Sequence, residues 1–160
     1  MKKNKKGFTL VELLAVIVVL AIIMVIAIPS VMDSMNKARK NSFKIYAQKV
    51  LNTASTQYQT DMLTSGSATK TCYPISTLMK QGAGNYVGYV MVSGSNSDNV
   101  EFTIVIADGN YYTAASGTGA STKGATYAGL EGSAIQTGDA KTPASGITKI
   151  TSTCPQGTTS

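Results

Sequence analysis

The sequence predicts an α+β fold in which a long N-terminal α-helix, half of it membrane-spanning, packs against a small antiparallel β-sheet. Three observations carry this prediction. Every residue from Leu13 to Ile28 is apolar. Beyond it, apolar residues recur at steps of three to four from Phe43 to Tyr58, which is the period of a helix. Further on, short segments rich in Val, Ile and Tyr alternate with turn-forming residues, which is typical of antiparallel strands.

The first half of the predicted helix follows a lysine-rich tail and carries one carboxylate, Glu12, near its start. From Leu10 to Ile28 the segment has nineteen residues with a single charge, which is close to the length of a membrane span of about 20 residues. An acidic residue at the centre of an inserted helix costs about 2.5–3.5 kcal/mol, so Glu12 is a functional candidate. Pro29 removes one helical hydrogen bond, and we therefore expect a kink there.

The second half of the helix is amphipathic and is expected to continue to about Met62. Lysines lie on one of its faces, and apolar residues form another. An apolar stripe of this kind is not stable alone, so the sequence must supply a surface that covers it. The stripe consists of Phe43, Ala47, Val50, Ala54 and Tyr58.

Three strands are predicted in the second half of the chain, at Tyr86–Val92, Val100–Ala107 and Tyr111–Ala115. The second of them alternates apolar and polar residues at its start. Asp108-Gly109-Asn110 between apolar runs is a strong hairpin signal. We therefore expect an antiparallel meander whose apolar face covers the helix.

The two flanks of this meander carry weaker signals. A short helix is expected to begin at Pro74 and to end before Gly82, because proline suits the first helical turn and glycine the position after the end. From Ser116 onward the chain is dominated by Gly, Ala, Ser and Thr. We expect an ordered surface loop there, followed by a strand near Gly146–Thr153.

The chain has no histidine, and its only cysteines are Cys72 and Cys154. Two lone cysteines fall short of the four ligands of a structural zinc site, and no catalytic constellation is visible, so we predict no metal, no cofactor and no enzyme. The two cysteines are either two buried thiols or one disulfide. A globular region outside the cytoplasm favours the disulfide.

The formal net charge of +6 does not indicate a nucleic-acid-binding domain. Four of the fourteen basic residues lie in the first six positions. The region from Leu51 onward has five basic residues against six acidic ones and is nearly neutral. Contact of the helix lysines with DNA is a weak alternative to a solvated face.

The segment Gly7-Phe8-Thr9-Leu10-Val11-Glu12, followed by an apolar helix, resembles the class III signal of type IV prepilins and pseudopilins. The resemblance is dense from Lys6 to Pro29, and the rest of the chain matches only in layout. One departure is visible. Many family members carry a glycine inside the apolar segment, whereas this chain has Ala21 and no glycine there. Any melting of the helix in a filament would then depend on Pro29 alone.

The resemblance implies roles for four residues at the start of the chain. A membrane peptidase cuts after Gly7 and methylates the new N-terminal Phe8. Glu12 and Thr9 belong to the assembly site, where Glu12 pairs with the N-terminal amine of a neighbouring subunit. The implied organisation has four parts: a cleaved leader (1–7), a transmembrane and filament-core half-helix (8–31), an amphipathic half-helix (32–62) and a globular sheet domain (63–160).

The resemblance implies a structural subunit of a type IV pilus that assembles into an extracellular helical filament. Its partners would be identical copies and related minor pilins, a prepilin peptidase, an inner-membrane platform protein and a cytoplasmic assembly ATPase. The precursor would lie in the cytoplasmic membrane and the filament on the cell surface, in a Gram-positive-type envelope. Two alternatives stay open: a pseudopilin for DNA uptake or secretion, and a monomeric surface protein on an uncleaved signal anchor.

Overall fold

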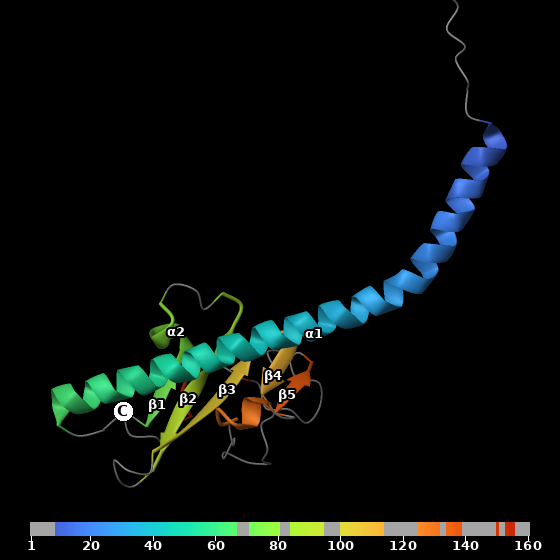
Figure 1. Cartoon of the computed structure of the whole chain (residues 1–160). Coiled ribbons are helices and arrows are strands. Elements are labelled where there is room, and N and C mark those ends of the chain that lie inside the picture. The colour runs from blue at the N-terminus through green and yellow to red at the C-terminus, as the bar shows by residue number, and fades with distance from the viewer. Residues whose placement is uncertain are drawn as a thin grey trace, which may run out of the picture. The chain divides into compact units, whose positions relative to one another are not determined.

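The computed structural model describes residues 9–66, 71–80, 84–94, 100–113, 125–131, 134–138, 150 and 153–155. The chain divides into two compact units, Met1–Arg39 and Lys40–Ser160, and each is described by itself. The α+β fold class is confirmed, because a long helix packs against an antiparallel sheet within the second unit (Figure 1).

Helix α1 extends from Leu10 to Ser65 and contributes residues to both units. Its bounds lie within three residues of the predicted ends, and the helix includes Pro29. The helix continues on both sides of this proline. The predicted continuous helix is therefore confirmed, while the kink at Pro29 stays a prediction.

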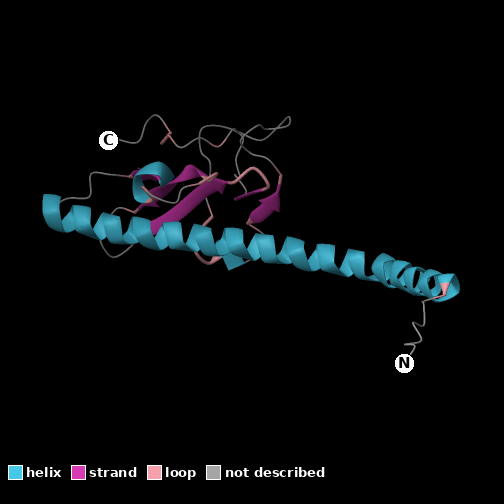
Figure 2. Ribbon diagram, turned by 90° about the horizontal axis from the view of Figure 1, so that it is seen from above, coloured by secondary structure: helices cyan, strands magenta, loops and turns pink. Residues whose placement is uncertain are grey.

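The sheet is an antiparallel meander in which each strand pairs with its neighbours in the sequence. Its order is β1 (Cys72–Pro74), β2 (Val87–Ser93), β3 (Glu101–Ala107), β4 (Tyr111–Thr113) and β5 (Ile135–Thr137). The three predicted strands correspond to β2, β3 and β4. The strand predicted near Gly146–Thr153 falls mostly outside the described residues. Figure 2 shows the strands along one side of α1.

The short helix predicted from Pro74 is present but begins one residue later and is shorter than expected. Pro74 instead ends β1, where it pairs with Tyr89 of β2. Proline is tolerated there because β1 is an edge strand. The helix α2 that follows is a single turn, Ile75–Leu78, and Gly82 lies outside the described residues. A second short element, the 3-10 turn η1, covers Gly129–Glu131.

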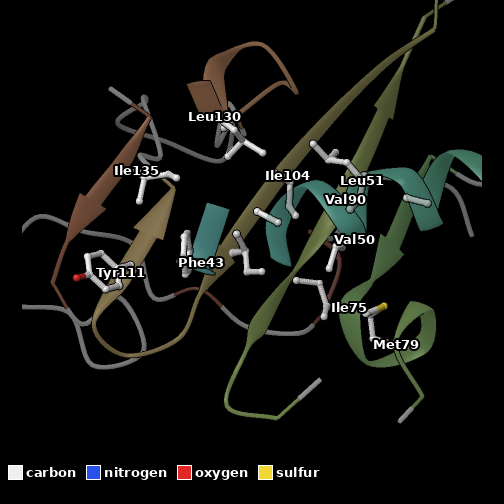
Figure 3. Close-up of a cluster of buried hydrophobic side chains, with 14 residues drawn as sticks. Phe43, Val50, Leu51, Ile75, Met79, Val90, Ile104, Tyr111, Leu130 and Ile135 are labelled. Carbon is white, nitrogen blue, oxygen red and sulfur yellow. The ribbon is translucent and has the colours of Figure 1, made fainter. Parts of the chain in front are cut away.

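The main hydrophobic core lies between the sheet and the part of α1 within the second unit. Phe43 and Val50 of α1 converge with side chains from α2, η1 and four strands (Figure 3). At one end of this core Tyr46 stacks on Tyr86, with ring centroids 3.8 Å apart. The predicted stripe is confirmed as the buried face, with Tyr58 only partly buried at its end. Its fully buried members are Phe43, Ala47, Val50 and Ala54, joined by Leu51.

A second, smaller cluster covers the opposite face of the sheet and was not predicted. Tyr89, Val105 and Tyr112 from three adjacent strands are buried there together with Ile150. Ile150 belongs to the C-terminal region, so residues far apart in the sequence close this face. The sheet is therefore buried on both faces, although the sequence indicated only the helix-facing side.

The predicted hairpin between β3 and β4 is confirmed. One carboxylate oxygen of Asp108 accepts hydrogen bonds from the N–H groups of Asn110 and Tyr111, both at 2.7 Å. Gly109 has a φ of 100°, a conformation that favours glycine. The side chain of Asp108 therefore closes the turn, and the following strand starts at Tyr111.

The hydroxyl of Thr113 replaces backbone pairing where β4 separates from β3. Thr113 is fully buried, and its Oγ1 accepts a hydrogen bond from the Ile106 N–H at 3.1 Å. The same hydroxyl donates to the Ile104 carbonyl at 3.2 Å. Ala125 pairs with Ile104 through two backbone hydrogen bonds of 2.8 Å. One side chain thus satisfies a buried N–H group that the two strands leave without a backbone partner.

We expect Thr113→Val to lower the free energy of unfolding by about 1–3 kcal/mol, because it leaves the buried Ile106 N–H without its acceptor. Thr113→Ser is the matched control, since it keeps the hydroxyl and removes only a methyl group. Urea unfolding followed by tyrosine fluorescence measures both variants. The chain has eight tyrosines and no tryptophan, and all the tyrosines lie in the second unit. A valine variant at least as stable as the serine variant would contradict this account.

Candidate functional site

The candidate site lies at the N-terminal end of α1. Of its predicted residues, Gly7 and Phe8 lie outside the described part of the chain, so the cleavage and methylation positions stay predictions. The structure brings Thr9 and Glu12 together. Thr9 immediately precedes the helix, and Glu12 is the third residue within it.

Thr9 and Glu12 form a capping box. Oε2 of Glu12 accepts hydrogen bonds from the Thr9 N–H at 3.0 Å and from the Thr9 hydroxyl at 2.9 Å. The Glu12 N–H faces Thr9 Oγ1 at 3.4 Å, a longer contact. This reciprocal pattern satisfies backbone donors that a helix start leaves without intrahelical partners. Both residues were predicted to belong to the site, but the cap was not predicted, although Thr-x-x-Glu before an apolar run is the known signature of a capping box.

The capping box explains how an acid is accommodated at the start of an apolar helix. Two hydrogen bonds to Oε2 replace part of the hydration that the carboxylate loses away from water. The negative charge also lies in the first turn, where the helix dipole is positive and favours an anion. Glu12 is therefore held in place by its own chain at the N-terminal end of the helix, with its carboxylate turned toward Thr9.

Among the described residues of its own unit, none covers the apolar part of α1. Its most apolar 18-residue window has a mean hydropathy of 3.3, and none of that window is buried. The side chains of Leu13, Ile17 and Ile28 are all more than half exposed. This helix is long and apolar enough to cross a membrane. Such a surface requires either lipid or other apolar helices around it.

The two predicted cysteines form a disulfide. Cys72 of β1 and Cys154 near the C-terminus are bonded, with Cα atoms 6.0 Å apart. Both cysteines pack against the cluster on the reverse face of the sheet that contains Ile150. The bond therefore fastens the C-terminal region to the edge strand beside that cluster.

Tyr73, next to the disulfide, ties β1 to helix α1. Its hydroxyl donates a hydrogen bond to Oδ2 of Asp61 at 2.9 Å. Burial raises the pKa of the Tyr73 phenol, and the hydrogen bond to the Asp61 carboxylate raises that pKa further. The phenol is therefore protonated at neutral pH and acts as a structural donor. Among the described residues, no group of three or more potential metal ligands lies together.

Comparison with known proteins supports the interpretation of the N-terminal segment. Residues 2–28 match the family model of the prokaryotic N-terminal methylation motif. The chain has no significant match to a curated protein or to a solved structure. The motif is the class III signal typical of type IV pilins and pseudopilins, which are structural and not enzymatic. This motif, at the start of a long helix packed on an antiparallel sheet, is the arrangement typical of type IV pilin-like proteins.

Proposed function

We propose that the chain is a structural subunit of a type IV pilus, made as a prepilin and assembled into an extracellular helical filament. The observation that carries the proposal is the methylation motif at residues 2–28, joined to an apolar helix with no cover of its own. In the precursor, lipid surrounds this helix. In the filament, the corresponding helices of other copies surround it.

In such a subunit the chain has four parts. Residues 1–7 are a leader that a prepilin peptidase removes, residues 8–31 span the membrane and later form the filament core, residues 32–62 are the amphipathic half-helix, and residues 63–160 form the globular domain. The platform protein, the cytoplasmic ATPase and related minor pilins are the partners that such assembly requires.

Cleavage after Gly7 would create a new amine on Phe8, directly before the capping box. The Glu12 carboxylate lies at this end of the helix. Its Oε2 atom accepts two hydrogen bonds from Thr9. Pairing of this carboxylate with the Phe8 amine of a neighbouring copy would neutralise two charges inside an apolar bundle. Such a pair is strongly favoured over either charge alone in a low-dielectric core.

A pseudopilin of a DNA-uptake or secretion system would share all these N-terminal features, and the two roles differ in the length and exposure of the filament. Electron microscopy with antibody to the globular domain separates them. A surface pilus gives long labelled filaments outside the cell. Short or envelope-confined labelled structures would favour a pseudopilin, and label spread evenly over the surface without filaments would favour a monomeric anchored protein.

A further inference from the structure

Two basic side chains follow the apolar part of α1. Lys37 and Arg39 are exposed, and both belong to the first unit. They begin a basic stretch, because the helix has four basic residues against one acidic residue from Asp33 to Lys44. The apolar segment is preceded along the chain by the lysines of the tail. Positive charge therefore flanks this segment in the sequence on both sides.

The rise of the helix gives the depth of Lys37 and Arg39 relative to a bilayer. A hydrocarbon core about 30 Å thick takes about 20 helical residues, so a span that begins at Leu10 ends near Ser30. The headgroup layer adds about 5–7 Å on each side. Lys37 lies about 10 Å beyond Ser30 along the helix axis, and Arg39 lies about 13 Å beyond it. The Cα atoms of both residues are thus a few ångströms outside the headgroup layer.

The direction of the two side chains closes this gap. Each Cα–Cβ bond of an α-helix tilts toward the helix N-terminus, which at this end of the span is toward the membrane. Lysine and arginine also lay their long apolar stems along apolar surface while the charged group reaches a polar layer. Met32 and Met35, on the preceding turns, are exposed and provide such a surface. The two cations can therefore reach the depth of the lipid phosphates.

We propose that Lys37 and Arg39 bind the phosphate groups of acidic phospholipids in the leaflet at this end of the span, and so hold the precursor at one depth in the membrane. The inference deepens the proposed function and rests on its first step, in which lipid surrounds residues 8–31. Phosphate oxygens accept hydrogen bonds from both cations, and a guanidinium can bind one phosphate through two parallel N–H groups. A zwitterionic headgroup brings its own cation beside the phosphate, so the lipid that we expect carries a net negative charge.

One acidic side chain competes with lipid for these cations. Asp33 is the only acidic residue between Glu12 and Asp61 in the sequence. It precedes Lys37 by four residues, so the two lie on one helix face and can pair. Arg39 lies about 120° around the helix from Asp33. A single carboxylate therefore cannot neutralise both cations, and positive charge is left for an acidic lipid.

Fluorescence quenching by brominated lipids tests this contact in the full-length chain. The chain has no tryptophan, so Met32→Trp gives a single reporter at this end of the span. Met32 is exposed and lies seven residues before Arg39, on the same helix face. The variant is reconstituted in vesicles with equal parts of phosphatidylcholine and phosphatidylglycerol, in which one lipid or the other has brominated chains. We expect brominated phosphatidylglycerol to quench at least about twofold more strongly, and added salt to reduce this preference.

Adding Lys37→Gln and Arg39→Gln to the reporter chain should make the two brominated lipids quench equally. The matched control adds Lys49→Gln instead, which removes an exposed base about 18 Å further along α1 than Lys37 and should keep the preference. Equal quenching in the reporter chain itself, or a preference that survives the double substitution, would overturn the lipid contact and leave the pilus proposal intact. Absence of quenching by either lipid would show that this helix does not lie in the bilayer, and would overturn both proposals.

Discussion

Glu12→Gln is expected to reduce the yield of sheared filaments at least about tenfold, while membrane level and cleavage after Gly7 remain close to wild type. Glutamine at the third helical position can still accept hydrogen bonds from Thr9, so the capping box is retained. The substitution removes the charge alone. Leaving the Phe8 amine of a neighbour buried without its partner costs about 3–5 kcal/mol, which disfavours the assembled state.

The measurement is the ratio of sheared filament protein to total membrane protein, with wild type and variant side by side. Thr9→Val is the matched control, since it removes the hydroxyl from the capping box and keeps the Glu12 charge. Its filament yield should stay closer to wild type than that of Glu12→Gln. Equal yields from wild type and Glu12→Gln would show that the carboxylate is not the assembly contact.

Loss of the disulfide is expected to lower the free energy of unfolding of the globular unit by about 4 kcal/mol. The bond joins positions separated by 82 residues, and closing a loop of this size restricts the unfolded chain strongly. It also fastens the C-terminal region beside Ile150, which closes the reverse face of the sheet. Processing after Gly7 should be unaffected, because that position lies in the other unit.

Urea unfolding of the detergent-solubilised full-length chain measures this effect. Wild type is compared with the double variant Cys72→Ser, Cys154→Ser, with and without reductant. Reductant should shift the wild-type midpoint to that of the variant and leave the variant unchanged. A reduced wild type that unfolds at the oxidised midpoint would contradict the proposed stabilisation.

The parts of the fold that the sequence predicted are those with strong local signals. The helix period from Phe43 to Tyr58 and the Asp108-Gly109-Asn110 turn each specify one local structure. The two strands that were missed, β1 and β5, have three residues each. Strands of that length carry almost no period of their own. They form because β2 and β4 offer edges for pairing, which is information from distant parts of the chain.

The burial of the reverse face of the sheet is a second feature that the sequence did not predict. The start of β3 alternates between apolar and polar residues, with Glu101 and Thr103 on the side away from the helix. Further along the same side, Val105 and Ala107 are buried. Their apolar character was visible in the sequence. Their cover was not, because Ile150 lies far along the chain and is brought there beside the disulfide.

The residues of the candidate site were predicted from its motif. The hydrogen bonds between them were not predicted. Resemblance to a prepilin signal assigned Glu12 to assembly between subunits. The structure adds that the same carboxylate caps its own helix through Thr9. The Thr-x-x-Glu spacing was sufficient to predict that cap from sequence. One carboxylate therefore has an intramolecular role in every copy, in addition to the intermolecular role that we propose.

The N-terminal peptide of protein from sheared filaments tests the central claim most directly. Mass spectrometry should find a peptide that begins at Phe8 and carries one additional methyl group on its amine. Gly7→Val, which places a side chain before the scissile bond, should leave only full-length precursor in the membrane. An intact Met1 would contradict the account of this chain as a processed filament subunit. So would a start at Ile28, which ordinary signal cleavage after Val25-Ile26-Ala27 would give.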